Sequence, residues 1–202
     1  MQKVLITLFA IISICLTTQA HHGYHVGDNI ADFSLKNIDG KNVSLANYTK
    51  AKGFIIVFTC NHCPYAKAYE DRIIALDKKY AALGYPVIAI NPNDAVQYPE
   101  DDYASMQQRA KEKGFTFPYL HDETQAVTKT FGAIKTPHIF IVKRENTNLN
   151  LKYVGTIDDN WEDASAVTET FVVNAVDELL ADKPVSVANT KAVGCSIKWK
   201  KP

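Results

Sequence analysis

The most regular hydrophobic pattern in the chain is an unbroken apolar run, Phe54 to Phe58, followed by apolar residues at three- and four-residue intervals. An unbroken run of this length is typical of a strand buried on both faces. The spacing over residues 65–83 predicts an amphipathic helix, and Gly84 is placed to end it. A second apolar run over residues 86–90 then completes a right-handed β-α-β unit with parallel strands.

The remaining pattern predicts a mixed sheet. Apolar and polar residues alternate over 31–36 and 41–45 around Asp39-Gly40, which predicts an N-terminal β-hairpin. We expect helices over 103–113 and 124–131, a third strand over 133–142, an antiparallel fourth strand over 151–155, and a closing helix capped by Asp163 or Ser165 that runs to about Ala181. The fold class is therefore α/β, with a central mixed sheet flanked by helices.

The segment between the second strand and the next helix is rich in acids, Asn and Pro, which predicts a loop over residues 91–102. It follows the carboxyl end of a parallel strand, where ligands usually bind in such sheets. A solvated surface excursion is the alternative interpretation.

The first twenty residues have the features of a secretory signal. Lys3 precedes an apolar run over residues 4–16, and Thr18 and Ala20 have the spacing read by signal peptidase. Cleavage after Ala20 predicts an exported protein, periplasmic or secreted, with one domain over residues 21–181 and a C-terminal tail over 182–202. An uncleaved membrane anchor is the alternative, but the run is shorter than the ~20 residues that a spanning helix needs.

Charge indicates no special partner. Lys and Arg total 22 and so do Asp and Glu, so no charge excess favours a nucleic acid, and no second apolar segment favours a membrane. Removal of the signal also removes Cys15, which leaves Cys60, Cys63 and Cys195. An odd number of cysteines in an exported protein leaves one thiol free for transient or intermolecular pairing.

Cys60 and Cys63 fall between the predicted strand and the predicted helix, and Pro64 suits the first turn of that helix. Unpaired N–H groups and the helix dipole stabilise a thiolate at this position, which lowers a thiol pKa from about 8.5. A reactive dithiol is the leading hypothesis. A structural disulfide or half of a zinc site is less favoured because no second Cys pair or matching His pair follows.

Four separated phrases carry a resemblance to a known group: Cys60 to Tyr65 (CNHCPY), residues 117–120 (FPYL), Thr136-Pro137, and residues 194–199 (GCSIKW). Together with the order of elements, they resemble the thioredoxin-like superfamily, and within it the peroxiredoxin-related redoxin (AhpC/TSA-related) proteins. The resemblance covers nearly the whole mature chain.

This resemblance implies a thiol–disulfide oxidoreductase. Cys60 would be the exposed nucleophile and Cys63 the buried resolving thiol, acting through a mixed disulfide on protein or small-molecule thiols and disulfides. No cofactor is implied beyond the Cys60–Cys63 disulfide. Pro137 would be cis and face the pair, and Thr136 would offer backbone hydrogen bonds to a substrate strand.

Asn61 and His62 would shape the site, and an imidazolium at His62 would favour the thiolate. An exposed His62 with little effect is the alternative. One departure concerns proton transfer: thioredoxins place a buried acid near the thiol pair, whereas this chain has Phe54 and Asn91 at the matching places.

Two other function classes remain open. A thiol peroxidase that reduces hydroperoxides would want Pro-x-x-x-Thr-x-x-Cys; aligned on Cys63, the chain has Cys60 in place of Thr and Ile56 in place of Pro. A copper or zinc delivery protein would combine Cys60 and Cys63 with the His-rich segment 21–25. This class ranks third, and no resident metal is predicted.

The role of Cys195 also has two interpretations. A mobile tail would make it an additional resolving thiol. Alternatively, the tail docks through Trp199 and leaves Cys195 buried and inert.

Overall fold

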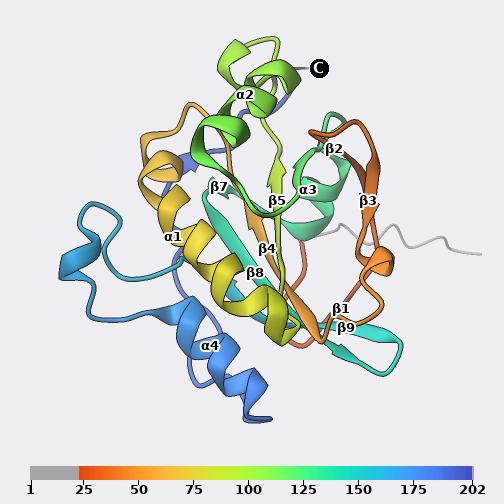
Figure 1. The fold of residues 1–202 in the computed structure, drawn as a ribbon, viewed down its shortest axis with the longest axis vertical. Helices are drawn as coiled ribbons and strands as arrows, with labels where there is room; N and C mark the ends of the chain where they lie inside the picture. Colours follow the sequence, from red (N-terminus) through yellow and green to blue (C-terminus); the bar gives the residue numbers. More distant parts are fainter. Residues whose placement is uncertain (1–22, 202) are drawn as a thin grey trace, which may run out of the picture.

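The computed structural model describes residues 23–201, so the expected signal segment lies outside the described residues. A central sheet carries helices on both faces (Figure 1). The strands are β1 (Asn29–Ile30), β2 (Ser34–Asn37), β3 (Asn42–Ser44), β4 (Gly53–Phe58), β5 (Val87–Asn91), β6 (Tyr119–His121), β7 (Lys135–Thr136), β8 (His138–Glu145), β9 (Asn148–Gly155) and β10 (Cys195–Ser196). The α-helices are α1 (Pro64–Tyr80), α2 (Tyr103–Lys113), α3 (Ala126–Phe131) and α4 (Phe171–Leu180), and the 3₁₀ helices are η1 (Leu45–Asn47), η2 (Ala81–Leu83), η3 (Pro99–Asp101) and η4 (Ala164–Ala166).

The main sheet has the strand order β1-β9-β8-β4-β5-β6-β2-β3. At its centre, β4 pairs in parallel with β5 and antiparallel with β8. Hairpin β2–β3 turns at Gly40, whose positive φ of +85° suits glycine. The expected α/β architecture, with a mixed sheet and an N-terminal hairpin, is confirmed.

Alternating side chains of β4 build two cores. Ile55 and Val57 pack against α1, α2 and α4, which lie over one face of the sheet (Figure 1). Phe54, Ile56 and Phe58 pack on the opposite face with residues of α3 and the N-terminal segments. All six residues of β4 are buried, which accounts for the apolar run in the sequence.

The structure differs from the expected elements in several places. The strand expected over 133–142 is interrupted at Pro137 and becomes β7 and β8. The short strands β1, β6 and β10 were not predicted. The closing helix begins later than expected, because Asp163 caps the short helix η4 instead, where its side chain accepts the Ser165 N–H at 2.8 Å.

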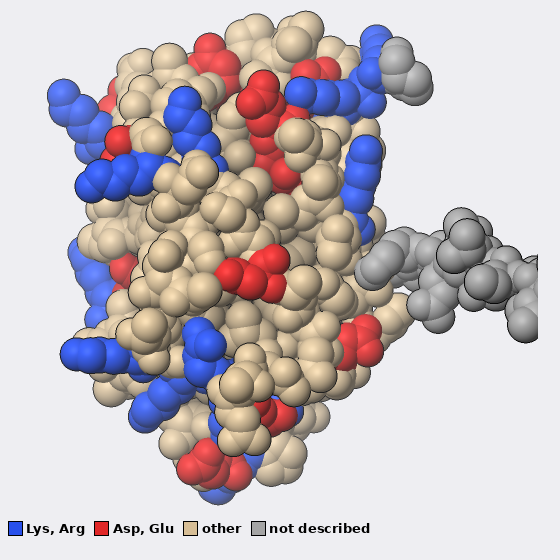
Figure 2. Space-filling view, turned by 90° about the vertical axis from the view of Figure 1, so that its right-hand side faces the viewer, with Lys and Arg blue, Asp and Glu red and all other residues tan. Residues whose placement is uncertain are grey.

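The C-terminal tail packs against the domain. The Val154 N–H of β9 donates to the Ala188 carbonyl and the Thr190 N–H donates to the Val154 carbonyl, both at 3.0 Å, and β10 forms a separate two-stranded ladder with β7. Among the described helices, none has the length and apolar character needed to span a bilayer. Acidic and basic side chains are interspersed over the face in Figure 2, in keeping with their equal numbers.

His138 begins β8 directly after Pro137 and is 6% exposed. Burial lowers the pKa of its imidazole from 6.5 to about 4. Its Nδ1 accepts the Ile134 N–H at 3.4 Å, which requires a neutral ring with the proton on Nε2.

We therefore expect stability to fall in mild acid. The unfolded chain binds a proton at His138 more readily than the folded protein, so the free energy of unfolding drops as the pH falls from 6.5 to about 4. The loss attributable to this residue is about 3 kcal/mol. Urea unfolding of the wild type and His138→Gln at pH 7 and pH 4.5 checks this: the variant should lose less stability, and equal losses would contradict the assignment.

Candidate active site

The register of β4 on β8 determines where the thiols lie. Phe58, the last residue of β4, pairs with His138, so the chain leaving β4 meets the chain entering β8. The Thr136–Pro137 peptide bond there is cis, as the resemblance implied. Cys60 Sγ lies 3.2 Å from Thr136 Oγ1, and Cys63 Sγ lies 3.2 Å from the Thr136 carbonyl oxygen. Thr136 therefore contacts both sulfurs.

Cys63 is the N-cap of α1 and Pro64 occupies the first helical turn. The local sequence explains this start, since Pro lacks the N–H that would remain unpaired there. The positive end of the helix dipole is directed at the thiol pair, which favours a negative charge on sulfur.

Cys60, Cys63 and Cys195 are free thiols, and the first two are buried at 2% and 0% exposure. The expectation of an exposed Cys60 was therefore wrong. Two neighbours from distant segments account for this burial: buried Asp101 lies within 4.8 Å of the Cys60 sulfur, and Cys195 from the C-terminal tail packs against the cluster that contains the pair. Cys195 itself keeps partial exposure.

A buried acid, Asp101, stands beside the pair. This last residue of η3 has no exposed surface, accepts the Asn61 N–H at 2.6 Å and Asn93 Nδ2 at 2.8 Å, and pairs with the His62 ring. We did not predict it, because the acid-rich loop that contains it resembled a solvated segment. The place of that loop after the carboxyl end of β5 was the available signal.

Asn61 and His62 are directed towards this loop and hold it. The Asn61 amide donates to the Glu100 carbonyl at 2.8 Å and accepts the Tyr119 hydroxyl at 2.9 Å. The His62 ring stacks on Tyr98 with 4.9 Å between centroids. Both residues thus shape the wall of the site.

The two sulfurs have opposite acidities. A hydrogen bond with Cys63, burial, and the negative charge of Asp101 all raise the pKa of Cys60. The pKa of Cys63 is lowered, first by the hydrogen bond from Cys60 and further by one from Cys195. Burial raises the pKa of Cys195 to about 11, and its hydrogen bond to Cys63 acts in the same direction. When protonated, Cys63 donates instead to the Thr136 carbonyl.

Cys60, His62 and Asp101 form a group that could hold a metal ion, with ligand atoms within 4.8 Å of one another. The Asp101 oxygens already accept several hydrogen bonds, however, so an ion would have to displace them. The segment that contains His25 is hydrogen-bonded to Leu151 of β9, which lies at the same end of the sheet as the start of β4. Cys60 follows the other end of β4. The described part of the His-rich segment therefore does not join the thiols, and His21 and His22 lie outside the described residues.

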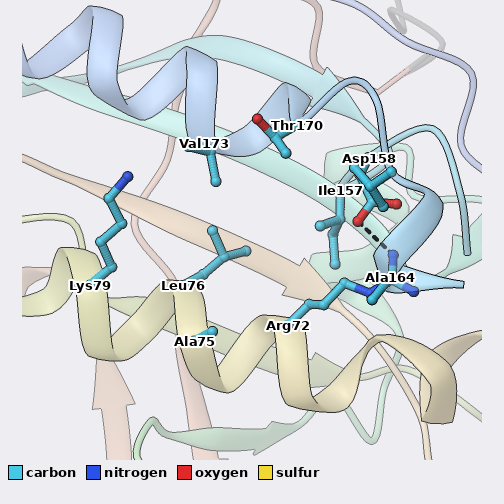
Figure 3. Close-up of a pocket in the computed structure, with 10 residues that line it drawn as sticks. Arg72, Ala75, Leu76, Lys79, Ile157, Asp158, Ala164, Thr170 and Val173 are labelled. Carbon is cyan, nitrogen blue, oxygen red and sulfur yellow. Dashed lines mark hydrogen bonds and ion pairs between the residues drawn. The ribbon is translucent and has the colours of Figure 1, made fainter.

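A groove of about 370 Å³ lies between α1 and the chain leading into α4 (Figure 3). Arg72 and Asp158 form an ion pair at 2.6 Å at one end, and Leu76 and Val173 supply apolar walls. No cysteine lines it. The thiol chemistry lies outside this groove.

Comparison with known proteins places the fold in one class. The AhpC/TSA family model matches residues 26–153. An uncharacterized conserved protein from Geobacillus kaustophilus is 38% identical, with a TM-score of 0.81 over 88% of this chain and 94% of that one. A hypothetical protein from Sinorhizobium meliloti 1021 is 32% identical, with a TM-score of 0.82 over 89% and 97%. Peroxidoxin BcpB from Mycobacterium tuberculosis, at 17% identity and a TM-score of 0.57 over 77% and 94%, shares the fold.

These matches define a thioredoxin-like fold, and in this chain that fold carries the buried pair Cys60 and Cys63. The chain belongs to the AhpC/TSA (redoxin) family. No curated protein matches it. Membership in this family indicates oxidoreductase activity on thiols, disulfides or peroxides in general, and the peroxiredoxin-related resemblance is confirmed.

We expect Asp101 to be a main support of the site. Asp101→Ala leaves the buried donors of Asn61 and Asn93 unpaired, so the free energy of unfolding should fall by about 2–4 kcal/mol. Alkylation of Cys60 by iodoacetamide should become faster in the same variant. Denaturant unfolding and peptide mass spectrometry of the reduced protein measure the two effects.

Glu100→Ala is the matched control, because Glu100 is the neighbouring acid of η3 and is exposed. Its free energy of unfolding should stay within about 0.5 kcal/mol of the wild type. Equal effects in the two variants would contradict the role of Asp101.

Proposed function

We propose that the protein is an exported thiol–disulfide oxidoreductase that uses Cys60 and Cys63 as its redox-active pair. The observation that carries this proposal is the meeting of two free thiols on Thr136, next to a cis-proline and at the first turn of α1. Family membership supports redox chemistry in general. The proposed cycle needs no cofactor beyond the Cys60–Cys63 disulfide.

We further propose that Cys63 carries the attack and Cys60 resolves, the reverse of the roles that the resemblance implies. Cys63 is the N-cap of α1, where the helix dipole stabilises a thiolate, and its pKa is lowered. Hydrogen bonding with Cys63, burial and the negative charge of Asp101 raise the pKa of Cys60. The thiolate is the nucleophile in disulfide exchange.

The proposed reaction balances as follows. The Cys63 thiolate attacks one sulfur of a substrate disulfide, forms a mixed disulfide and releases one substrate thiolate, which takes a proton. Cys60 gives up its proton and attacks Cys63, which closes the Cys60–Cys63 disulfide and releases the second substrate thiol. The substrate disulfide is reduced and the protein pair is oxidised; the reverse sequence oxidises a substrate dithiol.

A thiol peroxidase is the second candidate function. The position of Cys63 before Pro64 at a helix start favours it, as does the family. Peroxide chemistry would also need a hydroxyl beside the attacking sulfur, and the Thr136 hydroxyl lies 3.2 Å from Cys60 instead. Disulfide exchange therefore ranks first. Rapid peroxide consumption by the reduced protein, lost in Cys63→Ser and kept in Cys60→Ser, would reverse the order.

We expect the two cysteine variants to differ in kind. Cys63→Ser should slow the complete reduction of oxidised glutathione to two thiols by the reduced protein about a hundredfold, because the Cys60–Cys63 disulfide that releases the second thiol can no longer form. Cys60→Ser should still react with oxidised glutathione, but it cannot form the Cys60–Cys63 disulfide. Mass spectrometry of quenched reactions measures both. Loss of attack in Cys60→Ser with attack kept in Cys63→Ser would restore the roles that the resemblance implies.

Export is proposed from the sequence alone. The charged start, the apolar run over residues 4–16 and the small residues Thr18 and Ala20 support cleavage after Ala20. Expression of the full chain in a bacterium, followed by fractionation and N-terminal sequencing, should give a periplasmic or secreted protein that begins at His21. Recovery of the protein with residue 1 intact in the membrane fraction would favour the uncleaved anchor.

A further inference from the structure

The chain's own tail occupies the backbone edge beside the thiol pair. Strand β10 pairs antiparallel with β7, and Cys195 lies opposite Thr136. At the preceding residue, Gly194, a Cβ would approach the Thr136 carbonyl oxygen to 2.3 Å, so only glycine permits this contact. The edge at which Thr136 was expected to bind a substrate strand is therefore already filled by an internal strand that carries a cysteine.

This docking is held by buried polar groups. The Lys198 N–H donates to Asn93 Oδ1 at 2.9 Å, and Gln125 Nε2 donates to the Lys198 carbonyl at 2.8 Å. Asn93 and Gln125 are 3% and 1% exposed, and Ile197, between Cys195 and Lys198, is buried in the core. Trp199, the anchor in one of the two interpretations of the tail, is 40% exposed. Release of the tail would leave these polar groups unpaired, so the tail is a fixed part of the site.

The three cysteines lie together but differ in exposure. Cys195 packs against the small cluster of Cys60, Cys63 and Ala66, and its partner in the β10–β7 register is Thr136, which contacts both other sulfurs. The pair is buried, whereas Cys195 is partly exposed. An external thiol therefore reaches Cys195 before it reaches either member of the pair.

We propose that Cys195 is the access thiol of this protein: external thiols and disulfides react at Cys195, which passes the disulfide to and from Cys63 beneath it. The proposal rests on the proposed dithiol exchange and adds a third reacting group to it. Its partner is defined by chemistry as a thiol or disulfide, from a small molecule or from a redox protein.

The internal step needs no outside reactant. Starting from the Cys60–Cys63 disulfide, the sulfur of Cys195 loses its proton and attacks Cys63. The Cys63–Cys195 bond forms, the Cys60–Cys63 bond breaks, and Cys60 leaves as a thiolate that takes up the proton. One disulfide and one thiol are present before and after, so no net oxidation occurs.

The external step consumes two thiols. The first attacks Cys195, forms a mixed disulfide and expels Cys63 as a thiolate, which the helix N-terminus stabilises as a leaving group. The second attacks the external sulfur of that mixed disulfide and frees Cys195. Two external thiols become one disulfide, and the Cys63–Cys195 disulfide becomes two thiols.

The test compares reduction of the oxidised full-length mature protein with that of its Cys195→Ser variant. One arm uses reduced glutathione and the other a reduced protein dithiol such as thioredoxin. We expect the variant to be reduced about tenfold or more slowly than the wild type. Slowing in both arms, or in one, supports the proposal and identifies the source of the thiol. Equal rates in both arms overturn it. Failure of the variant to oxidise under conditions that oxidise the wild type also supports it, because the oxidant then passes through Cys195.

Two further variants sharpen the result. Cys195→Ser combined with Ser196→Cys keeps the number of thiols but places the new one on the opposite face of β10, so it should not restore the rate. Restoration would overturn the proposal. Oxidised Cys60→Ser should contain a Cys63–Cys195 disulfide, seen by mass spectrometry of unreduced peptides, and absence of that link would overturn the proposal as well.

Failure of this proposal is distinguishable from failure of the proposed function. If Cys195→Ser exchanges as fast as the wild type while Cys63→Ser loses exchange, the proposed dithiol function stands and the proposed role of Cys195 is wrong. If Cys63→Ser exchanges as fast as the wild type, the dithiol exchange itself is wrong.

Discussion

The pairing register between β4 and β8 is the constraint on which the rest of the site depends. Because Phe58 lies opposite His138, the residues after β4 and the residues before β8 must meet at one end of the sheet. A shift of one residue would turn the alternating side chains of β4 to the wrong faces and separate both cores from their helices. Burial of β4 thus fixes the register that brings Thr136 against the two sulfurs.

The electrostatic surroundings of the two sulfurs beside Thr136 differ. The first turn of α1 offers a positive environment to Cys63, while Asp101 offers a negative one to Cys60. The acid is itself stabilised by N–H donors from Asn61 and Asn93. One short loop therefore both supports the wall of the site and separates two chemically identical thiols by their acidity.

Local patterns of apolar and polar residues predicted most of the fold. The apolar run of β4 and the helical spacing of α1 and α2 depend on neighbours in sequence, and glycines at 84 and 114 end their segments with positive φ. The strands β6 and β10 have only three and two residues and exist through pairing with distant segments, so no local pattern identifies them.

Among the site residues, the dithiol, Thr136 and Pro137 were predicted from sequence motifs. Asp101 was not, because a buried acid and a solvated acid look alike in a loop with other acids. The enclosure of Cys60 depends on the far end of the chain and could not be read locally.

The docked tail has a kinetic consequence. A thiol tethered beside its reaction partner by a strand pairing and by buried anchors has an effective concentration far above the millimolar levels of free thiols. Exchange between Cys63 and Cys195 is then set by sulfur geometry and acidity rather than by encounter. The concentration of external oxidant would govern how fast the disulfide forms and that of external reductant how fast it is reduced, while the position of the disulfide among the three sulfurs would equilibrate independently of both. Such a protein would store one disulfide, that is, two oxidising equivalents, with the thiol that reacts with external partners separate from the buried pair.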